Sequence, residues 1–240
     1  MIRLRGIGFA YNPGEPVLEG LDLDLSPGLT LLVGPNGCGK STLLKIAAGV
    51  ERPDRGRIEI DGHDAWAAEA AARQSLAYVP EQPDLTPYAT VREILRLVCR
   101  LRGEPVGEAE TALARVGLGA LAHRSVRELS MGQRRRAVLA AAFIGRPTHI
   151  LLDEPLEAMD RGARDDILAW IDGLTIGGGG ATVLTVSHDL APFAPRASRA
   201  VTVRQGKTAV WDPLPGDPEE RRALLERLAR GEEGATLGLA

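Results

Sequence analysis

Apolar and polar residues alternate along the first thirty residues of the chain. Leu21, Leu23 and Leu25 are separated by aspartates, and this period of two predicts a strand with one buried face. After a proline–glycine turn, residues 29–33 form a continuous apolar run, which is typical of a central strand that is covered on both faces. Turn residues on either side of residues 57–60 predict a further edge hairpin.

A helical period begins after Thr90. Thr90 and Glu93 have the spacing of a capping box, and apolar residues then recur every three or four positions as far as Leu101. Arginines occupy the opposite face of this segment. A helical region is therefore expected to start here and to run to about Ile144.

Strands and helices alternate in the rest of the chain. Buried-type strands are expected at 149–152 and 182–186 with a helix at about 164–174 between them, and a hairpin follows at 200–210. An amphipathic helix is expected at about 217–231. This alternation predicts an α/β fold with a mostly parallel core sheet.

These elements suggest how the chain of 240 residues is divided. We expect one domain, with a core lobe at about 1–84 and 146–210 and a helical lobe at about 85–145. The core lobe is expected to begin with an antiparallel β-subdomain. A chain with 44% hydrophobic and 25% charged residues has the composition of a soluble globular protein, and at this length it needs no metal or disulfide to stabilise its core.

The overall charge argues against a nucleic-acid partner. The chain has 29 basic and 32 acidic residues and a formal net charge of −3, which provides no basic surface for a polyanion. Its longest apolar run, at 137–144, is too short to cross a bilayer, and no signal peptide opens the chain. A cytoplasmic location is expected, where Cys38 and Cys99 stay reduced.

A glycine-rich segment follows the apolar run at 29–33. It matches the phosphate-loop pattern G-x-x-x-x-G-K-[ST] with Gly34, Pro35, Asn36, Gly37, Cys38, Gly39, Lys40 and Ser41. Backbone N–H groups of such a loop point at phosphate oxygens at the positive end of the next helix. Lys40 is expected between the β- and γ-phosphates and the Ser41 hydroxyl on Mg²⁺. The alternative is a glycine turn that merely joins a strand to a helix, but Lys40 is one of only three lysines beside 26 arginines, which favours a chemical role.

Two acids end the apolar strand at 149–152. Asp153 is expected at the carboxyl end of this strand, beside the phosphate loop, where it can hold Mg²⁺. Glu154 is the next residue and is free to polarise an attacking water molecule. An ordinary surface strand end is the alternative. Together with the phosphate loop, the acids predict hydrolysis of a nucleoside triphosphate.

A short segment before the second half of the chain resembles a family signature. Leu129-Ser130-Met131-Gly132-Gln133 is similar to LSGGQ, the signature of the ATP-binding cassette (ABC) family, and the resemblance spans roughly Arg3 to Gly206. It implies a P-loop NTPase fold of the ABC type. It also implies that Tyr11 stacks on adenine, that Gln82 touches Mg²⁺ or water and links the two lobes, and that His188 contacts the γ-phosphate. Further nucleotide contacts are implied for Thr42, Ser130, Gly132, Gln133 and Asp160.

The sequence departs from the family pattern at two positions. Met131 replaces the first glycine of the signature pair, which is expected to weaken closure of the nucleotide site. Glu157 replaces the serine of the family's common Ser-Ala-Leu-Asp, although Asp160 is kept. In addition, the arginines at 134–136 oppose the dipole of their helix. Two compensations are open, a triphosphate on a partner chain or a solvated face paired with Glu128 or other residues.

The resemblance implies a function and a set of partners. Two copies, or one copy and a homologous ATPase subunit, would form a head-to-tail dimer with ATP between Lys40 of one chain and Ser130 of the other. Transmembrane permease subunits would dock near Gln82 and the Thr90 helix, on the cytoplasmic face of the membrane. Residues 90–95 look like export-type cassettes, so we expect export. The alternatives are a soluble ABC-type ATPase outside transport, a chromosome-maintenance or repair ATPase, and a nucleotide kinase.

Overall fold

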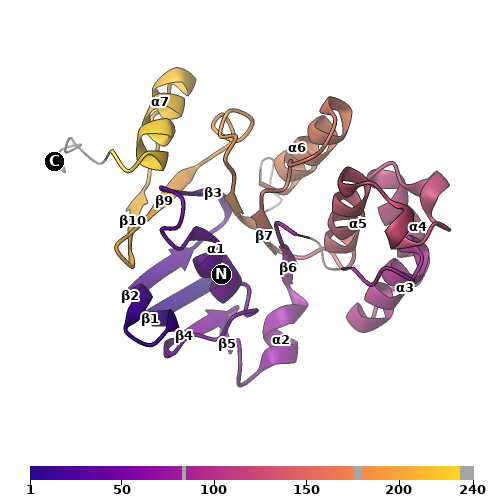
Figure 1. Cartoon of the computed structure of the whole chain (residues 1–240), viewed down its shortest axis with the longest axis horizontal. Helices are drawn as coiled ribbons and strands as arrows, with labels where there is room; N and C mark the ends of the chain where they lie inside the picture. The colour runs from indigo at the N-terminus through magenta and orange to yellow at the C-terminus, as the bar shows by residue number, and fades with distance from the viewer. Residues whose placement is uncertain (83–84, 176–179, 233–240) are drawn as a thin grey trace.

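The computed structural model describes residues 1–82, 85–175 and 180–232, and two β-sheets form its centre (Figure 1). The antiparallel sheet has the strand order β2-β1-β4-β5, and the six-stranded sheet has the order β10-β9-β3-β8-β7-β6. The first sheet consists of β1 (Ile2–Asn12), β2 (Glu15–Leu25), β4 (Arg55–Ile60) and β5 (His63–Asp64). The second consists of β3 (Gly28–Val33), β6 (Leu76–Val79), β7 (His149–Asp153), β8 (Thr182–Val186), β9 (Arg199–Arg204) and β10 (Lys207–Trp211).

The N-terminal strands pair as the alternating pattern predicts. In β2, Leu21, Leu23 and Leu25 are buried, and the aspartates between them are exposed. Leu25 pairs with Ile2 of β1 in an antiparallel ladder. The hairpin expected at 57–60 is formed by β4 and the short β5. Side-chain alternation therefore places one face of this sheet in the core.

The six-stranded sheet is parallel except at one edge. β3 pairs in parallel with β8 and β9, and β7 pairs in parallel with β8 and β6, whereas β10 is antiparallel to β9. Leu29 and Leu31 of β3 belong to one buried core and Leu32 belongs to the other. The expectations of a mostly parallel core sheet and of a central strand covered on both faces are confirmed. The carboxyl ends of β3, β7 and β8 meet at one edge of this sheet, where open α/β sheets bind ligands.

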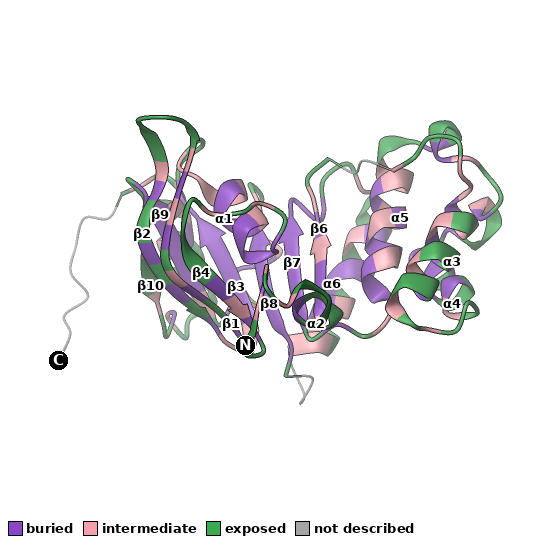
Figure 2. Ribbon diagram, turned by 90° about the horizontal axis from the view of Figure 1, so that it is seen from below, coloured by how far each residue is buried: buried purple, intermediate pink, exposed green. Residues whose placement is uncertain are grey.

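The helices surround the six-stranded sheet and extend beyond its β6 edge (Figures 1 and 2). They are α1 (Lys40–Ala47), α2 (Glu69–Gln74), α3 (Val91–Arg102), α4 (Glu108–Arg115), α5 (Met131–Phe143), α6 (Arg161–Thr175) and α7 (Pro218–Ala229). α3, α4 and α5 pack against one another at one end of the molecule. The division of the chain into two lobes stays a prediction.

The predicted start of α3 is confirmed in detail. The Thr90 hydroxyl accepts from the Glu93 N–H at 3.2 Å, and the Glu93 carboxylate accepts from the Thr90 N–H at 2.8 Å. This reciprocal capping box satisfies two backbone donors that a helix end leaves free. Among the described helices, none combines the length and the apolar character that crossing a bilayer requires.

Candidate nucleotide-binding site

The loop between β3 and α1 has the backbone geometry of a phosphate cradle. Gly34, Gly37 and Gly39 all have positive φ, at 149°, 77° and 104°, which residues with a side chain rarely adopt. Gly39 is also the N-cap of α1, and in the described residues no side chain caps this helix and no acid lies in its first turn. The N–H groups at this helix end are therefore left to an anion.

Lys40 lies at the mouth of this loop. Its Nζ donates to the carbonyl oxygens of Gly34 and Pro35 at 2.8 and 2.9 Å. These two bonds hold the ammonium group beside the glycine-rich segment. A compact positive charge on a flexible stem is suited to contact phosphate oxygens there.

Ser41 and Asp153 come together as the sequence predicts, although 112 residues separate them. The Ser41 Oγ donates to the Asp153 Oδ1 at 3.5 Å. Asp153 is buried at the end of β7, and burial raises the pKa of its carboxyl against the opposing effect of the Ser41 bond. Hydroxyl and carboxylate oxygens are hard donors of the kind Mg²⁺ prefers, so these two residues would fit a Mg²⁺ ion.

Glu154 follows Asp153 and points into the same pocket. One carboxylate oxygen, Oε2, accepts from the Ser187 hydroxyl at 3.3 Å, and Oε1 lies 3.7 Å from the His188 Nε2. The Glu154 side chain is 11% exposed and that of His188 is 69% exposed. Burial raises the pKa of Glu154, while His188 and Ser187 act in the opposite direction. A largely buried carboxylate with a raised pKa is typical of a general base.

Tyr11 covers the first turn of α1. Its hydroxyl lies 3.2 Å from the Thr42 Oγ1, and its ring meets Phe9 edge to face at 4.8 Å between centroids. Tyr11 is 57% exposed, so much of the ring is free for stacking.

Ten of the sequence-predicted residues line one pocket of about 440 Å³. Those that line it are Tyr11, Asn36, Gly37, Gly39, Lys40, Ser41, Thr42, Asp153, Glu154 and His188. Val17, Glu81 and Val186 also line it and were not predicted. Glu81 directly precedes the predicted residue Gln82, and this position is the sequence signal that could have identified Glu81.

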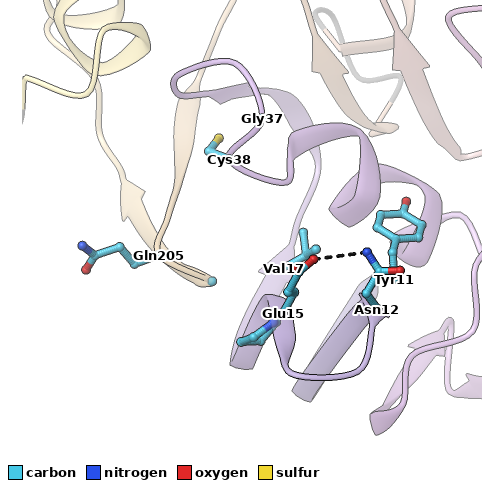
Figure 3. Close-up of a pocket in the computed structure, with 9 residues that line it drawn as sticks. Tyr11, Asn12, Glu15, Val17, Gly37, Cys38 and Gln205 are labelled. Atoms are coloured by element: carbon cyan, nitrogen blue, oxygen red, sulfur yellow. Dashed lines mark hydrogen bonds between the residues drawn. The ribbon is translucent and has the colours of Figure 1, made fainter.

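A second cavity of about 450 Å³ adjoins this pocket and shares Tyr11, Val17 and Gly37 with it (Figure 3). Cys38 and Gln205 line its far part. Figure 3 shows Cys38 on the phosphate loop across from the β1–β2 turn. The two cavities therefore lie side by side along the loop.

Several predicted residues do not line the pocket of this chain. Gln82 is exposed, and its place in the pocket wall is taken by Glu81. Ser130, Gly132, Gln133 and Asp160 are likewise not part of the wall. Ser130 caps α5 by accepting from the Gln133 N–H at 3.3 Å, and Asp160 accepts from the Ala163 N–H at the start of α6 at 2.9 Å. Their nucleotide contacts stay predictions.

Of the two compensations left open for the α5 arginines, the pairing with Glu128 is not formed. The Glu128 carboxylate bonds to Ser125 instead. Arg134 donates to the carbonyls of Val126 and Arg127, and Arg136 donates to that of Val116. Arg135 is not on a solvated face but buried, and it also donates to carbonyl oxygens. Backbone carbonyls, which carry partial negative charge, compensate these cations.

The signature helix touches the loop after Glu154 within one chain. A Cβ on Gly132 would lie 2.4 Å from the carbonyl oxygen of Ala158. Ala158 itself has a positive φ of 56°. The close approach explains why the second signature position is a glycine here, whereas the first position carries Met131, whose side chain is 59% exposed.

Comparison with known proteins agrees with this geometry. The profile of the family described as ABC transporter matches residues 18–157. The chain is 36% identical over 212 residues to the Fe(3+) ions import ATP-binding protein FbpC of Mesorhizobium japonicum, covering 86% of this chain and 58% of that protein. It is 38% identical over 224 residues to the aliphatic sulfonates import ATP-binding protein SsuB of Cupriavidus necator, covering 92% of this chain and 69% of that protein.

Two further similar proteins bear on the direction of transport and on dimerisation. The cytochrome c biogenesis ATP-binding export protein CcmA of Cupriavidus necator is 38% identical over 192 residues, covering 79% of this chain and 83% of that protein. The dimeric post-hydrolysis structure of an ATP-binding cassette with ADP and phosphate bound superposes with a TM-score of 0.80 at 25% identity, covering 90% of this chain and all of that one. The phosphate loop, the paired acids and these likenesses together show that the chain belongs to the ABC transporter family, as one of its ATP-binding and ATP-hydrolysing subunits.

Proposed function

We propose that the pocket beside α1 binds MgATP and hydrolyses it with Glu154 as the general base. The single observation that carries this proposal is the convergence of Lys40, Asp153, Glu154 and His188 on one pocket. Lys40 contacts the β- and γ-phosphates, and Glu154 accepts a proton from the water that attacks the γ-phosphate. His188, which lies beside the Glu154 carboxylate, contacts the γ-phosphate.

The adenine base of ATP occupies the second cavity in this proposal. Tyr11 stacks on adenine, because its exposed ring stands between the two cavities. The phosphate-loop residues from Gly34 to Gly39 then contact the phosphate groups.

Ser41 and Asp153 are the proposed protein ligands of Mg²⁺. Gln82, which does not line the pocket of this chain, is proposed as a further ligand from the β6–α3 segment. When bound, the ion neutralises charge that develops on the phosphates. The short separation of Ser41 from Asp153 supports this assignment.

Ser130, Gly132 and Gln133 complete the site of a second chain in the proposed dimer. Ser130 and Gln133 lie at the N-terminus of α5, where backbone N–H groups favour an anion. Their position outside this chain's own pocket supports a contact made across a dimer. Asp160, which caps α6, lies on the loop that meets Gly132 and is proposed to contact the partner's nucleotide.

A permease subunit is proposed to dock in a groove between α2 and α3. The groove has a volume of about 1100 Å³ and includes Val50, Arg73 and Leu101 in its wall. Leu101 is 77% exposed and Val50 is 53% exposed, which are high values for large apolar side chains. Docking there would hold the chain peripherally at the cytoplasmic face of the membrane.

The proposed direction of transport is import. FbpC and SsuB are named for import and CcmA for export. The expectation of export from residues 90–95 is therefore not supported. These residues form the capped start of α3. The substrate is proposed to be selected by the permease.

The test of the proposed site is phosphate release from MgATP without an added acceptor. The parent chain is expected to release phosphate, and Lys40→Ala is expected to weaken ATP binding about tenfold or more because it removes a charged phosphate contact. Lys207→Ala, on the β10 edge strand, is the control and is expected to match the parent. ATP binding by Lys40→Ala at parental affinity would contradict the site.

A further inference from the structure

Arg135 is a buried cation next to the catalytic end of β7. Only 2% of the residue is exposed, and its side chain leaves α5 toward the carboxyl end of the core sheet. Nη2 donates to the carbonyl oxygens of Asp153 and Glu154, and Nη1 donates to that of Glu81. A buried charge needs such partners, because desolvation without them is costly.

The carboxylates around Arg135 add to these bonds. Burial lowers the pKa of Arg135, and the carboxylates of Glu157, Glu154, Asp153 and Glu81 oppose this effect by favouring the guanidinium charge. Arg135 is therefore held by the same segments that carry the proposed Mg²⁺ ligand and general base.

The backbone of Glu154 requires an external restraint. Its φ is +49°, in the left-handed region that a residue with a Cβ seldom occupies. Three groups hold it there. The Glu154 N–H donates to the Val186 carbonyl at 3.0 Å, and the Glu154 carbonyl accepts from the Glu157 N–H at 3.2 Å and from Arg135.

This backbone conformation decides where the carboxylate lies. A change at φ would rotate the side chain away from Ser187 and His188, which it meets at 3.3 and 3.7 Å. A general base works only when it is within hydrogen-bond reach of the water that it deprotonates.

We propose that Arg135 is a positioning residue for ATP hydrolysis, which fastens the Glu154 backbone to the signature helix α5 and to the segment before Gln82. The inference rests on the proposed function, in which Glu154 is the base. Arg135 does not line the nucleotide pocket. Through Arg135, the position of the Glu154 carboxylate depends on the position of α5. The helix that is proposed to contact the partner's ATP is thereby coupled to the general base of this chain.

Arginine suits this role better than lysine or glutamine. Its planar guanidinium presents five N–H donors in a fixed fork and can bridge carbonyls on two segments at once. Lysine keeps the charge but has a single nitrogen, and glutamine has a single amide and no charge. A graded loss is therefore expected, with Arg135→Lys above Arg135→Gln.

The experiment compares four proteins in the full chain: the parent, Arg135→Gln, Arg135→Lys and Arg221→Gln. Arg221 is the matched control, because its guanidinium also donates to backbone carbonyls, those of Ala194, Pro195 and Ala197, at the base of α7. Equilibrium binding of a fluorescent ATP analogue, kcat for phosphate release and thermal unfolding are measured for each.

The expected result is a split between binding and turnover. Arg135→Gln should bind the analogue within about threefold of the parent, since the phosphate loop is untouched, while kcat falls about tenfold or more. Arg135→Lys should be intermediate in kcat, and Arg221→Gln should keep the parental kcat. If Arg135→Gln does not fold, the same split in Arg135→Lys carries the test.

Two results would overturn the inference. The first is an unchanged kcat in both Arg135 variants, and the second is a loss of binding that parallels the loss of kcat. Glu154→Gln is measured alongside: hydrolysis by that variant at the parental rate would defeat the proposed function itself, whereas a parental rate in the Arg135 variants alone would defeat only this inference.

Discussion

The Glu154 carboxylate lies 3.7 Å from the His188 imidazole, and this pair faces the phosphate loop from the far side of the pocket. The two residues come from different segments, one directly after β7 and the other two residues after β8. The parallel pairing of β7 with β8 sets Asp153 opposite Val186, so the sheet register itself brings the two side chains together. The buried member has the raised pKa and the exposed member is free to move toward a ligand.

Substituting Gly132 tests the contact between the signature helix and the loop after Glu154. A methyl group at Gly132 would lie 2.4 Å from the Ala158 carbonyl, a backbone atom that cannot turn aside. Gly132→Ala is expected to destabilise the chain by about 1–3 kcal/mol, as overpacking does, and to lower ATP hydrolysis. Urea unfolding and phosphate release measure the two effects.

Gly173 provides the control for that substitution. It is exposed in α6, and a Cβ there meets no atom within 4 Å among the described residues. Gly173→Ala should stabilise the helix by about 0.5–1 kcal/mol. Equal effects of the two substitutions on stability would show that the Gly132 contact is not tight.

Alkylation of Cys38 is expected to block ATP binding. Cys38 is partly exposed on the phosphate loop, and its sulfur would lie 2.9 Å from a Cβ on Gly34. A maleimide on this sulfur would fill the second cavity, which Cys38 lines. MgATP should slow the labelling about tenfold when it is present at ten times its Kd, because it occupies the same space.

Cys99 makes the labelling experiment specific. It is fully buried in α3, and burial raises the pKa of its thiol. One thiol, not two, should react in the native chain, and Cys38→Ser should keep ATP binding after treatment. A labelling rate that MgATP leaves unchanged would place the nucleotide elsewhere.

Asp61, whose side chain is 42% exposed, and the buried His149 link the N-terminal sheet to β7. The His149 Nε2 lies 2.9 Å from the Asp61 Oδ1, and the Ser75 hydroxyl donates to Asp61 Oδ2 at 2.8 Å. Burial acts to raise the pKa of Asp61, but bonds from the Met1 ammonium group, His149 and Ser75 outweigh it and lower the pKa. Burial also lowers the pKa of His149.

Both shifts predict loss of stability in acid. An unfolded chain with the ordinary histidine pKa of 6.5 takes up a proton below that pH before the folded chain does, so unfolding becomes easier as the pH falls from 7 to 5. The Asp61 contribution is complete above the ordinary aspartate pKa of 3.8 and is lost only as the pH falls further, toward the folded value. Urea unfolding at pH 7, 6 and 5 measures the first effect.

Asp61→Asn should cost about 1–2 kcal/mol at pH 7, because it weakens the partner of a buried imidazole. Asp24→Asn, in an exposed pair with Arg5 at 2.6 Å, should cost under about 0.5 kcal/mol. Stability that is independent of pH between 7 and 5 would show that His149 does not have a lowered pKa.

Local features of the fold could be predicted from the sequence. The alternation in β2 and the apolar run of β3 depend on a few neighbouring residues, as do the capping box at Thr90 and the glycines of the phosphate loop. Each of these patterns is fixed by the geometry of one strand, one helix turn or one loop. The placement of Asp153 and Glu154 at the same edge as Lys40 followed from the parallel sheet.

Contacts between distant segments could not be predicted in this way. The period of α5 places Arg135 on a helix but does not show that the end of β7 and the Glu81 carbonyl are within its reach. The same holds for the approach of Gly132 to Ala158 and for the link between Asp61 and His149. In each case the contacting residue is determined by packing between elements. The hydrophobic period of one element contains no information about that packing.

The measurement that tests the account most directly is the behaviour of Glu154→Gln with saturating MgATP in size-exclusion chromatography and phosphate release. If Glu154 is the base and ATP joins two chains, the variant should elute as a dimer with ATP retained and should release no phosphate above background, while the parent returns to monomer as ATP is consumed. A variant that stays monomeric with ATP bound, or that hydrolyses ATP at the parental rate, would contradict the account.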